Sequence, residues 1–154
     1  MNQYLKQFIE EKFNKSGKAL DLGAGEFYNV ACLKHFGWKC DGVDKNQGIN
    51  LEKKYIAKNS PYDLVFSNFV FHQIKNKSIF LNTIIDNLKY NGWVFLQTFD
   101  TTDKICKRGI DKKELREFFR QQGLKNISTK IFSHYDNDLG HKHWHKILQI
   151  TAQK

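Results

Sequence analysis

The chain has 154 residues, of which 40% are hydrophobic and 14% aromatic; this excludes a disordered chain and suffices for one domain with a sizeable core. It carries 25 Lys and Arg against 16 Asp and Glu, and the formal net charge of +9 leaves an anionic partner open. No run approaches the roughly 18 apolar residues that span a bilayer, and the first 15 residues mix acids with bases unlike a signal peptide, so we expect a cytoplasmic protein with no membrane partner.

The positive charge comes almost entirely from lysine, because only three of the 25 basic residues are arginine. Arginine is the residue suited to bidentate contacts with phosphates and bases. The lysines are spread along the chain, as on an ordinary solvated surface. A nucleic-acid partner therefore stays open but is less favoured, and nothing in the sequence fixes the oligomeric state.

The three cysteines, Cys32, Cys40 and Cys106, lie far apart and form no CxxC pair. An odd, scattered set argues against a disulfide framework and against a zinc knuckle. We interpret them as buried or incidental thiols.

Hydrophobic spacing predicts helices and strands that alternate through most of the chain. Helices are predicted at residues 2–15, 26–36, 78–88 and 111–123. Strands are predicted at residues 18–22, 38–43, 62–68, 93–99, 124–135 and 143–152. Residues 49–51 are read either as a further short strand or as part of a loop.

Several local details accompany these elements. Phe36 is expected to face the core, Ser78 to cap the third helix, and Asp111 with Glu114 to begin the fourth helix as a capping box. A turn at 136–140 should join the last two strands.

This order of elements predicts an α/β fold. The early strands are near-continuous apolar runs, which is typical of a parallel sheet covered on both faces. The last two strands have no helix between them and should form an antiparallel hairpin. We therefore expect one compact, minimal domain over 1–154, built as a three-layer α/β/α sandwich around a mostly parallel sheet.

The stretch KALDLGAGEF, residues 18–27, places an acid and two glycines at the end of the first strand. In such sheets ligands bind beyond the carboxyl ends of the strands, and glycine lets the backbone approach a ligand closely. The following helix should also offer free N–H groups. Asp44 ends the second strand, 19 residues after Gly25, where its carboxylate can accept both hydroxyls of a ribose. Together these features predict a nucleoside ligand.

The kind of nucleoside follows from two side chains. A dinucleotide fingerprint needs a small residue where this chain has Tyr28, which is too bulky for close contact between helix and strand. Asp21 would repel a pyrophosphate but suits an ammonium group. S-adenosylmethionine combines an amino-acid moiety with a ribose and has no phosphate, so it fits better than NAD.

With these features the chain resembles the class I S-adenosylmethionine-dependent methyltransferases. ALDLGAGEF resembles the first motif of that family, GVDKN the second, YDLVFSNFVFHQI the motif of strand four, and NGWVFLQTF the segment of strand five. The resemblance covers about residues 18–100, and the order of the motifs makes it specific. It implies a Rossmann-like fold and S-adenosyl-L-methionine as the cofactor.

The resemblance also implies roles for single residues. Asp21, Gly23, Ala24 and Gly25 would line the methionine end of the cofactor. Asp44 would hold the ribose, Lys45 would lie beside the adenine, and Asn50 or Leu51 would stand near the adenine amino group. Ser67, Asn68 and Phe69 would close the donor pocket.

The middle of the chain departs from the family pattern. Only 17 residues separate Asp44 from Tyr62, so most of the usual second helix and third strand is missing. The acidic residue that normally meets the adenine amino group has no clear equivalent. The donor site is therefore predicted in a shortened form.

The acceptor is less clearly marked than the donor. Enzymes that methylate amino groups of nucleic acids carry Pro-Pro and an aromatic residue after strand four, whereas this chain has Ser67-Asn68-Phe69-Val70. A small-molecule acceptor is therefore favoured. An RNA or protein acceptor that uses the basic surface, and a methyltransferase-like module without turnover, stay as alternatives.

Histidines near the C-terminus add candidates for the acceptor side. His141, His143 and His145 alternate, so a strand would project all three from one face. Such imidazoles can share a metal ion, contact a substrate or act in catalysis, or be ordinary polar residues of the strand. No metal is assigned. His72, one turn past the predicted strand at 62–68, is a further candidate at the rim of the pocket.

Residues 136–154 also resemble, over a short stretch, the tail of tellurite-resistance-type methyltransferases. That resemblance places His141 and His143 near the acceptor mouth. The catalytic candidates are therefore His72, His141 and His143. The domain is expected to divide into an N-terminal helix (1–17), a cofactor-binding part (18–100) and a substrate-side part (101–154).

Overall fold

The computed structural model describes residues 1–138 and 141–154, and it describes no side chain at residues 138 and 141. The elements follow in the order α1 (Gln3–Lys12), β1 (Lys18–Leu22), α2 (Tyr28–His35), β2 (Lys39–Val43), the short 3-10 helix η1 (Lys45–Gln47), β3 (Tyr62–Asn68), the 3-10 helix η2 (Phe71–Gln73), α3 (Lys77–Asn87), β4 (Leu88–Phe99), α4 (Lys112–Gln121), β5 (Lys125–Asp138) and β6 (His141–Gln153).

Six strands form one sheet in the order β2-β1-β3-β4-β6-β5. The pairs β1–β2, β1–β3 and β3–β4 are parallel, whereas β4–β6 and β5–β6 are antiparallel. The expected mostly parallel sheet with a C-terminal antiparallel hairpin is confirmed. Because β2 and β3 lie on opposite sides of β1, the chain order reverses at β1, and a crevice opens there at the carboxyl ends of the strands.

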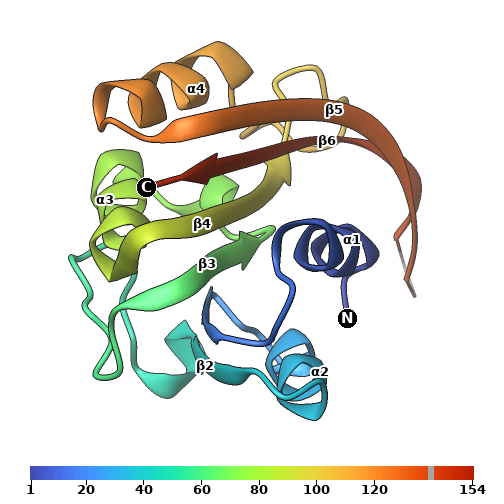
Figure 1. The fold of residues 1–154 in the computed structure, drawn as a ribbon. Coiled ribbons are helices and arrows are strands. Elements are labelled where there is room, and N and C mark those ends of the chain that lie inside the picture. The colour runs from blue at the N-terminus through green and yellow to red at the C-terminus, as the bar shows by residue number, and fades with distance from the viewer. Residues whose placement is uncertain (139–140) are drawn as a thin grey trace.

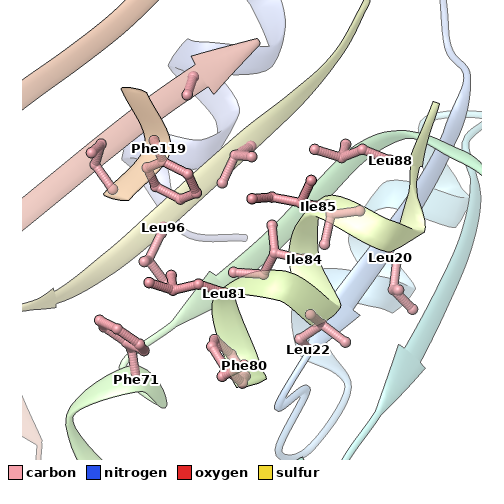
Figure 2. Packing of buried hydrophobic residues seen from close by; sticks show 14 of the residues in the cluster. Leu20, Leu22, Phe71, Phe80, Leu81, Ile84, Ile85, Leu88, Leu96 and Phe119 are labelled. Atoms are coloured by element: carbon pink, nitrogen blue, oxygen red, sulfur yellow. The ribbon is translucent and has the colours of Figure 1, made fainter. Parts of the chain in front are cut away.

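Helices cover both faces of the sheet, which gives the three layers seen in Figure 1. On one face, α3 and α4 pack against the apolar side chains that alternate along the strands, and Figure 2 shows this cluster around Phe80, Ile84 and Phe119. On the other face, α1 and α2 pack against a second cluster that includes Phe8 and Phe95. The alternation places each strand residue on one of two buried faces.

Side chains cap the first turns of α1 and α4, whereas α3 has no such side-chain cap. The Asn2 side chain accepts hydrogen bonds from the N–H groups of the first turn of α1, and Asp111 does the same for α4, as predicted. The expectation for Ser78 is wrong, because α3 already begins at Lys77 and Asn76 takes the cap position.

The expected inward position of Phe36 is also wrong, since 59% of its surface is exposed. Helix α2 ends at His35, and Gly37 then reverses the backbone with φ of +81°. Leu33 and Trp38 are buried in its place.

Residues 49–51 form no strand. Ile49 donates its N–H to the Asp44 carbonyl oxygen at 3.3 Å, and Glu52 donates to Oδ1 of Asn50 at 2.9 Å. These local bonds fold the segment back on itself as a loop.

The C-terminal hairpin is longer than the sequence indicates. β5 pairs with β6 as far as Asp138 opposite His141, so residues 136–138 of the expected turn belong to a strand, and residues 139–140 lie outside the described part. The pairing of β4 with β6 ends at Phe99 opposite Ile147. The hairpin therefore runs past the sheet and curves beside α1 (Figure 1).

Within the part of the chain that the structure describes, no helix has both the length and the apolar character needed to cross a membrane. The cytoplasmic location stays a prediction.

Candidate active site

The glycine bend after β1 and the acid after β2 meet at the switch point. The Asp44 carboxylate accepts the N–H of Gly25 on Oδ2 at 3.1 Å and that of Asn46 on Oδ1 at 3.0 Å. Asp44 thereby ties the two loops together and caps η1. The sequence placed these residues at the ends of separate strands, and the fold brings them to one crevice.

The N–H groups of the glycine bend are already used within the protein. Gly23 and Ala24 both donate to the Val43 carbonyl oxygen, at 2.8 and 3.0 Å, and Phe27 donates to Ala24 at 2.9 Å. The expectation of free N–H groups concerned the first turn of the following helix α2, and for that turn it stays a prediction. The bend lacks the cradle of N–H groups that binds phosphate, which agrees with a ligand without phosphate.

A cavity of about 620 Å³ opens over these loops, within the size range of small-molecule pockets. Its lining includes eight of the eleven predicted cofactor residues: Gly23, Gly25, Asp44, Lys45, Asn50, Leu51, Asn68 and Phe69. Three others lie outside the lining: Asp21, Ala24 and Ser67. The Ser67 hydroxyl donates to the Leu22 carbonyl oxygen at 2.6 Å, so this side chain joins β3 to β1 instead of facing the cavity.

Asp21 is buried below the glycine bend with 1% of its surface exposed. Neither carboxylate oxygen has a hydrogen-bond partner within the protein. Burial, and to a lesser extent the charge of Asp44, raise the pKa of Asp21 to about 8. The residue is therefore protonated at neutral pH until a cation stabilises its ionised form.

The end of β3 supplies a second unsatisfied polar group. Both Oδ1 and Nδ2 of Asn68 are buried without a partner, and the residue lines the cavity. The next residue, Phe69, has φ of +58°, a left-handed conformation that is strained for a bulky side chain. Unpaired polar groups and strain at one strand end are typical of a ligand site.

The shortened connection between β2 and β3 still provides a wall. The Glu52 carboxylate accepts the N–H groups of Lys75 and Asn76, at 2.8 and 2.9 Å, and these bonds lower its pKa. They join the loop after β2 to the loop after η2. Ile49 and Ile74, from these two loops, add apolar surface to the cavity.

A second cavity, of about 390 Å³, lies beside the first and is called here the aromatic hollow. Its lining comes from the N-terminus, the ends of β3 and β4, and the hairpin: Met1, Asn2, Gln3, Tyr4, Phe69, Gln97, Phe132, His134 and Ile147. The rings of Tyr4 and Phe132 lie 4.4 Å apart. Phe69 lines both cavities, so they meet at this one side chain.

The histidines gather around Phe99 at the end of β4. The rings of His72 and His145 pack on Phe99 at 4.7 and 4.6 Å, and His143 packs on His145 at 4.6 Å. His72 and His143 are therefore connected through the rings of Phe99 and His145, whereas the side chain of His141 lies outside the described residues. In the described residues, no group of three His, Cys, Asp or Glu is placed to hold a metal ion.

Sequence reasoning missed Asp103 and His145, which form a buried pair. Nδ1 of His145 lies 3.0 Å from Oδ2 of Asp103, and the two side chains are 9% and 0% exposed. The alternation of histidines along β6 is the sequence feature that indicates His145 as a candidate. Nothing in the sequence marked Asp103, because it lies in an irregular loop.

The residues present fit S-adenosylmethionine on three observations. Buried Asn68 atoms without partners line the cavity. A Cβ on Gly25 would meet no protein atom within 4 Å, so the backbone there faces open space. Each Asp44 oxygen keeps a lone pair for a ribose hydroxyl beyond the N–H that it already accepts. This α/β fold, with its crevice at the switch point, defines a nucleoside-binding protein of the Rossmann-like class.

Comparison with known proteins gives the family. Residues 1–139 match the family model described as a methyltransferase domain, so the chain belongs to this family. It is an S-adenosylmethionine-dependent methyltransferase of class I, as its motifs indicated. No curated protein matches the chain in sequence.

Several solved structures share the fold. A 1,6-didemethyltoxoflavin-N1-methyltransferase from Burkholderia thailandensis is 15% identical with a TM-score of 0.72, and the match covers 99% of this chain and 77% of that one. TehB from Haemophilus influenzae is 15% identical with a TM-score of 0.76, and the match covers 100% of this chain and 62% of TehB. A methyltransferase from Archaeoglobus fulgidus is 15% identical with a TM-score of 0.71, and the match covers 98% of this chain and 91% of that one.

Proposed function

We propose that the protein transfers a methyl group from S-adenosylmethionine in the larger cavity to a small molecule bound in the aromatic hollow. The observation that carries this proposal is the shared wall at Phe69, which brings the two cavities together. When bound, S-adenosylmethionine supplies a methyl group already activated by its positive sulfur. The protein then needs mainly to position the acceptor and exclude water.

Four sets of side chains of this chain would hold the donor. The Asp44 carboxylate would accept the ribose hydroxyls, and the apolar side chains of Ile49, Leu51 and Ile74 would enclose the base. The buried amide of Asn68 would meet the amino-acid moiety. Asp21 would stabilise the ammonium group from below, and this contact would keep its carboxylate ionised.

The aromatic hollow suits a small, uncharged acceptor. Among the described residues, its lining has no Asp, Glu, Lys or Arg side chain, and aromatic rings form much of it. The α-ammonium group of Met1, which also belongs to the lining, donates to Sγ of Cys32 at 3.5 Å. Two fold neighbours were crystallised with small molecules, namely 1,6-didemethyltoxoflavin and, in a Haemonchus contortus enzyme of which this chain covers 52%, phosphomonomethylethanolamine. The division expected from the sequence stays part of this proposal, with residues 18–100 on the donor side and residues 101–154, together with the N-terminal helix α1, on the acceptor side.

The test is calorimetry with S-adenosylhomocysteine, followed by methyl transfer to small acceptors. Asp44→Asn should weaken binding roughly tenfold to a hundredfold, because one charged acceptor of the ribose is lost. Asp86→Asn is the control, since Asp86 forms an exposed ion pair with Lys54. Phe132→Ala should leave this binding unchanged and reduce transfer.

Absence of binding at high micromolar concentration would contradict the proposal. Binding without transfer to any small molecule would favour a module without turnover. Salt-sensitive RNA binding together with transfer to RNA would favour the basic surface as the acceptor site.

A further inference from the structure

The buried pair of Asp103 and His145 is built to hold an imidazole in one orientation. Oδ2 of Asp103 lies 3.0 Å from Nδ1 of His145 and also accepts the N–H of Lys146 at 2.6 Å. Oδ1 accepts the N–H groups of Ile105 and Cys106, at 2.8 and 2.6 Å. Although burial works in the opposite direction, these donors lower the pKa of Asp103. Asp103 is therefore a fixed anion.

The protonation of His145 follows from this contact. An ionised carboxylate can only accept, so Nδ1 of His145 carries the hydrogen and donates it to Asp103. In the neutral ring, Nε2 then keeps its lone pair on the side away from Asp103. A histidine oriented by a carboxylate in this way can take up a proton from a reacting group.

The position of the pair connects it with the aromatic hollow. His145 lies opposite His134 in the hairpin, and His134 lines the hollow. Ile147, two residues along the same face of β6, lines it as well. Phe99 packs on His145 and, at 5.4 Å, on Phe69, the wall between the cavities. His145 is thus at the edge of the hollow, with 9% of its side chain exposed.

The lining of the hollow indicates which acceptors would need such a group. The described lining has no carboxylate, ammonium or guanidinium side chain, and its aromatic rings, those of Tyr4, Phe69 and Phe132, favour a flat, uncharged ring. The Gln97 side chain, which accepts from Nδ2 of Asn2 at 2.8 Å, adds a polar edge. The hydroxyl or ring N–H of an uncharged acceptor still holds its proton when it binds, so its methylation needs a base.

We infer that His145 is the base, that Asp103 positions it, and that the acceptor is a small aromatic or heteroaromatic molecule with a hydroxyl or ring N–H. This inference rests on the proposed function. The O–H or N–H bond of the acceptor breaks and its proton goes to Nε2 of His145. The O or N atom forms the new bond to the methyl carbon, and the electron pair of the C–S bond stays on sulfur. The proton then passes from His145 to solvent.

Several titratable groups face His145 and enter its pH dependence. Asp103 comes from the loop after β4, His72 from η2, His134 from β5 and His143 from β6 itself. Burial, and then the charges of Lys77, Arg108 and His145, lower the pKa of His72. His72 is therefore uncharged in the neutral range, and Asp103 supplies the negative charge beside His145.

The first experiment needs no turnover. Long-range proton–nitrogen spectra of protein labelled with ¹⁵N-histidine should show His145 with its hydrogen on Nδ1 at pH 8, and Asp103→Asn should change this tautomer. His35→Gln, on the exposed part of α2, is the control and should leave the His145 signals unchanged. A hydrogen on Nε2 of His145 in the wild type would overturn the inference.

The second experiment compares two probes of similar size, 4-methylphenol and thiophenol, at pH 8. The phenol must lose its proton, whereas the thiol is already ionised. His145→Gln should lower kcat/KM for the phenol about 10²–10⁴-fold, remove the rising limb of its pH profile, and change the thiophenol rate only a few-fold. An equal loss for both probes, or a loss for the phenol with His72→Gln alone, would overturn the assignment.

Calorimetry separates this inference from the function on which it rests. His145→Gln should bind S-adenosylhomocysteine like the wild type, because the residue does not line the donor cavity. If the wild type does not bind it, the proposed function fails. If it binds but methylates neither probe, the His145 signals decide, because 4-methylphenol should shift them and their insensitivity would overturn the inference.

Discussion

Replacing Asp21 with asparagine should make the ligand-free protein more stable and less sensitive to pH. The Asp21 carboxyl is buried without a partner, and its pKa is raised from 3.8 to about 8. Between these values the folded state holds a proton that the unfolded state has released, so stability falls as pH rises. The slope is about 1.4 kcal/mol per pH unit, or about 3 kcal/mol between pH 5 and 7. Asparagine is uncharged and has almost the same shape, so it removes this slope.

Urea unfolding at pH 5, 6, 7 and 8 measures the effect as a difference between the two proteins, in which other titrating groups largely cancel. The free energy of unfolding of Asp21→Asn, relative to that of the wild type, should increase across this pH range. For the exposed control Asp86→Asn, this difference from the wild type should stay constant. In the same proteins, affinity for S-adenosylhomocysteine should rise with pH from 6 to 8 in the wild type only. Parallel unfolding curves for Asp21→Asn and the wild type would refute the reasoning.

Substitutions at four further positions test the geometry around the larger cavity. Gly23→Ala should destabilise the protein by more than about 2 kcal/mol in urea unfolding, because its Cβ would lie 2.2 Å from Val70 Cγ2 at φ of +86°. Ser67→Ala should cost about 1–3 kcal/mol, since a buried carbonyl loses its 2.6 Å donor, yet calorimetry should show donor binding within a few-fold of the wild type. Glu52→Gln should speed dissociation of S-adenosylhomocysteine several-fold in stopped flow, because the two loops lose their charged link. The Phe69→Gly variant should be more stable than Phe69→Ala by about 1 kcal/mol, because only glycine relieves the left-handed strain, although alanine is elsewhere the more stabilising of the two residues. Equal stability of the two variants would contradict this.

The cavity at the switch point could be predicted from the sequence because its determinants are local. A glycine bend after a buried strand and an acid after the next strand each occupy a strand end, and a parallel sheet brings such ends to one edge. The argument against a dinucleotide from the bulk of Tyr28 was wrong in its premise, because Tyr28 is 67% exposed. The close contact between α2 and the sheet occurs at Gly42 instead, where a Cβ would lie 2.7 Å from Val30.

The errors arise where tertiary contacts decide the structure. Phe36 has the spacing of a core residue, but α2 ends one residue before it. Residues 49–51 are apolar enough for a strand, but local hydrogen bonds and the Glu52 link hold them as a loop. Asp103 is the clearest case, since its partner His145 is 42 residues away in the chain and only the assembled hairpin brings the two together.

The meeting of the two cavities at Phe69 explains why strain persists there. Its N–H donates to the Gln97 carbonyl oxygen at 2.9 Å, which extends the β3–β4 pairing, while its ring packs on Phe99. Both contacts can be made only if the backbone turns sharply after Asn68, and the left-handed conformation provides that turn. The turn thereby leaves Asn68 in the lining of the larger cavity and Phe69 in the lining of both cavities. In the proposed function, the strain at Phe69 would therefore keep donor and acceptor on opposite sides of a single side chain.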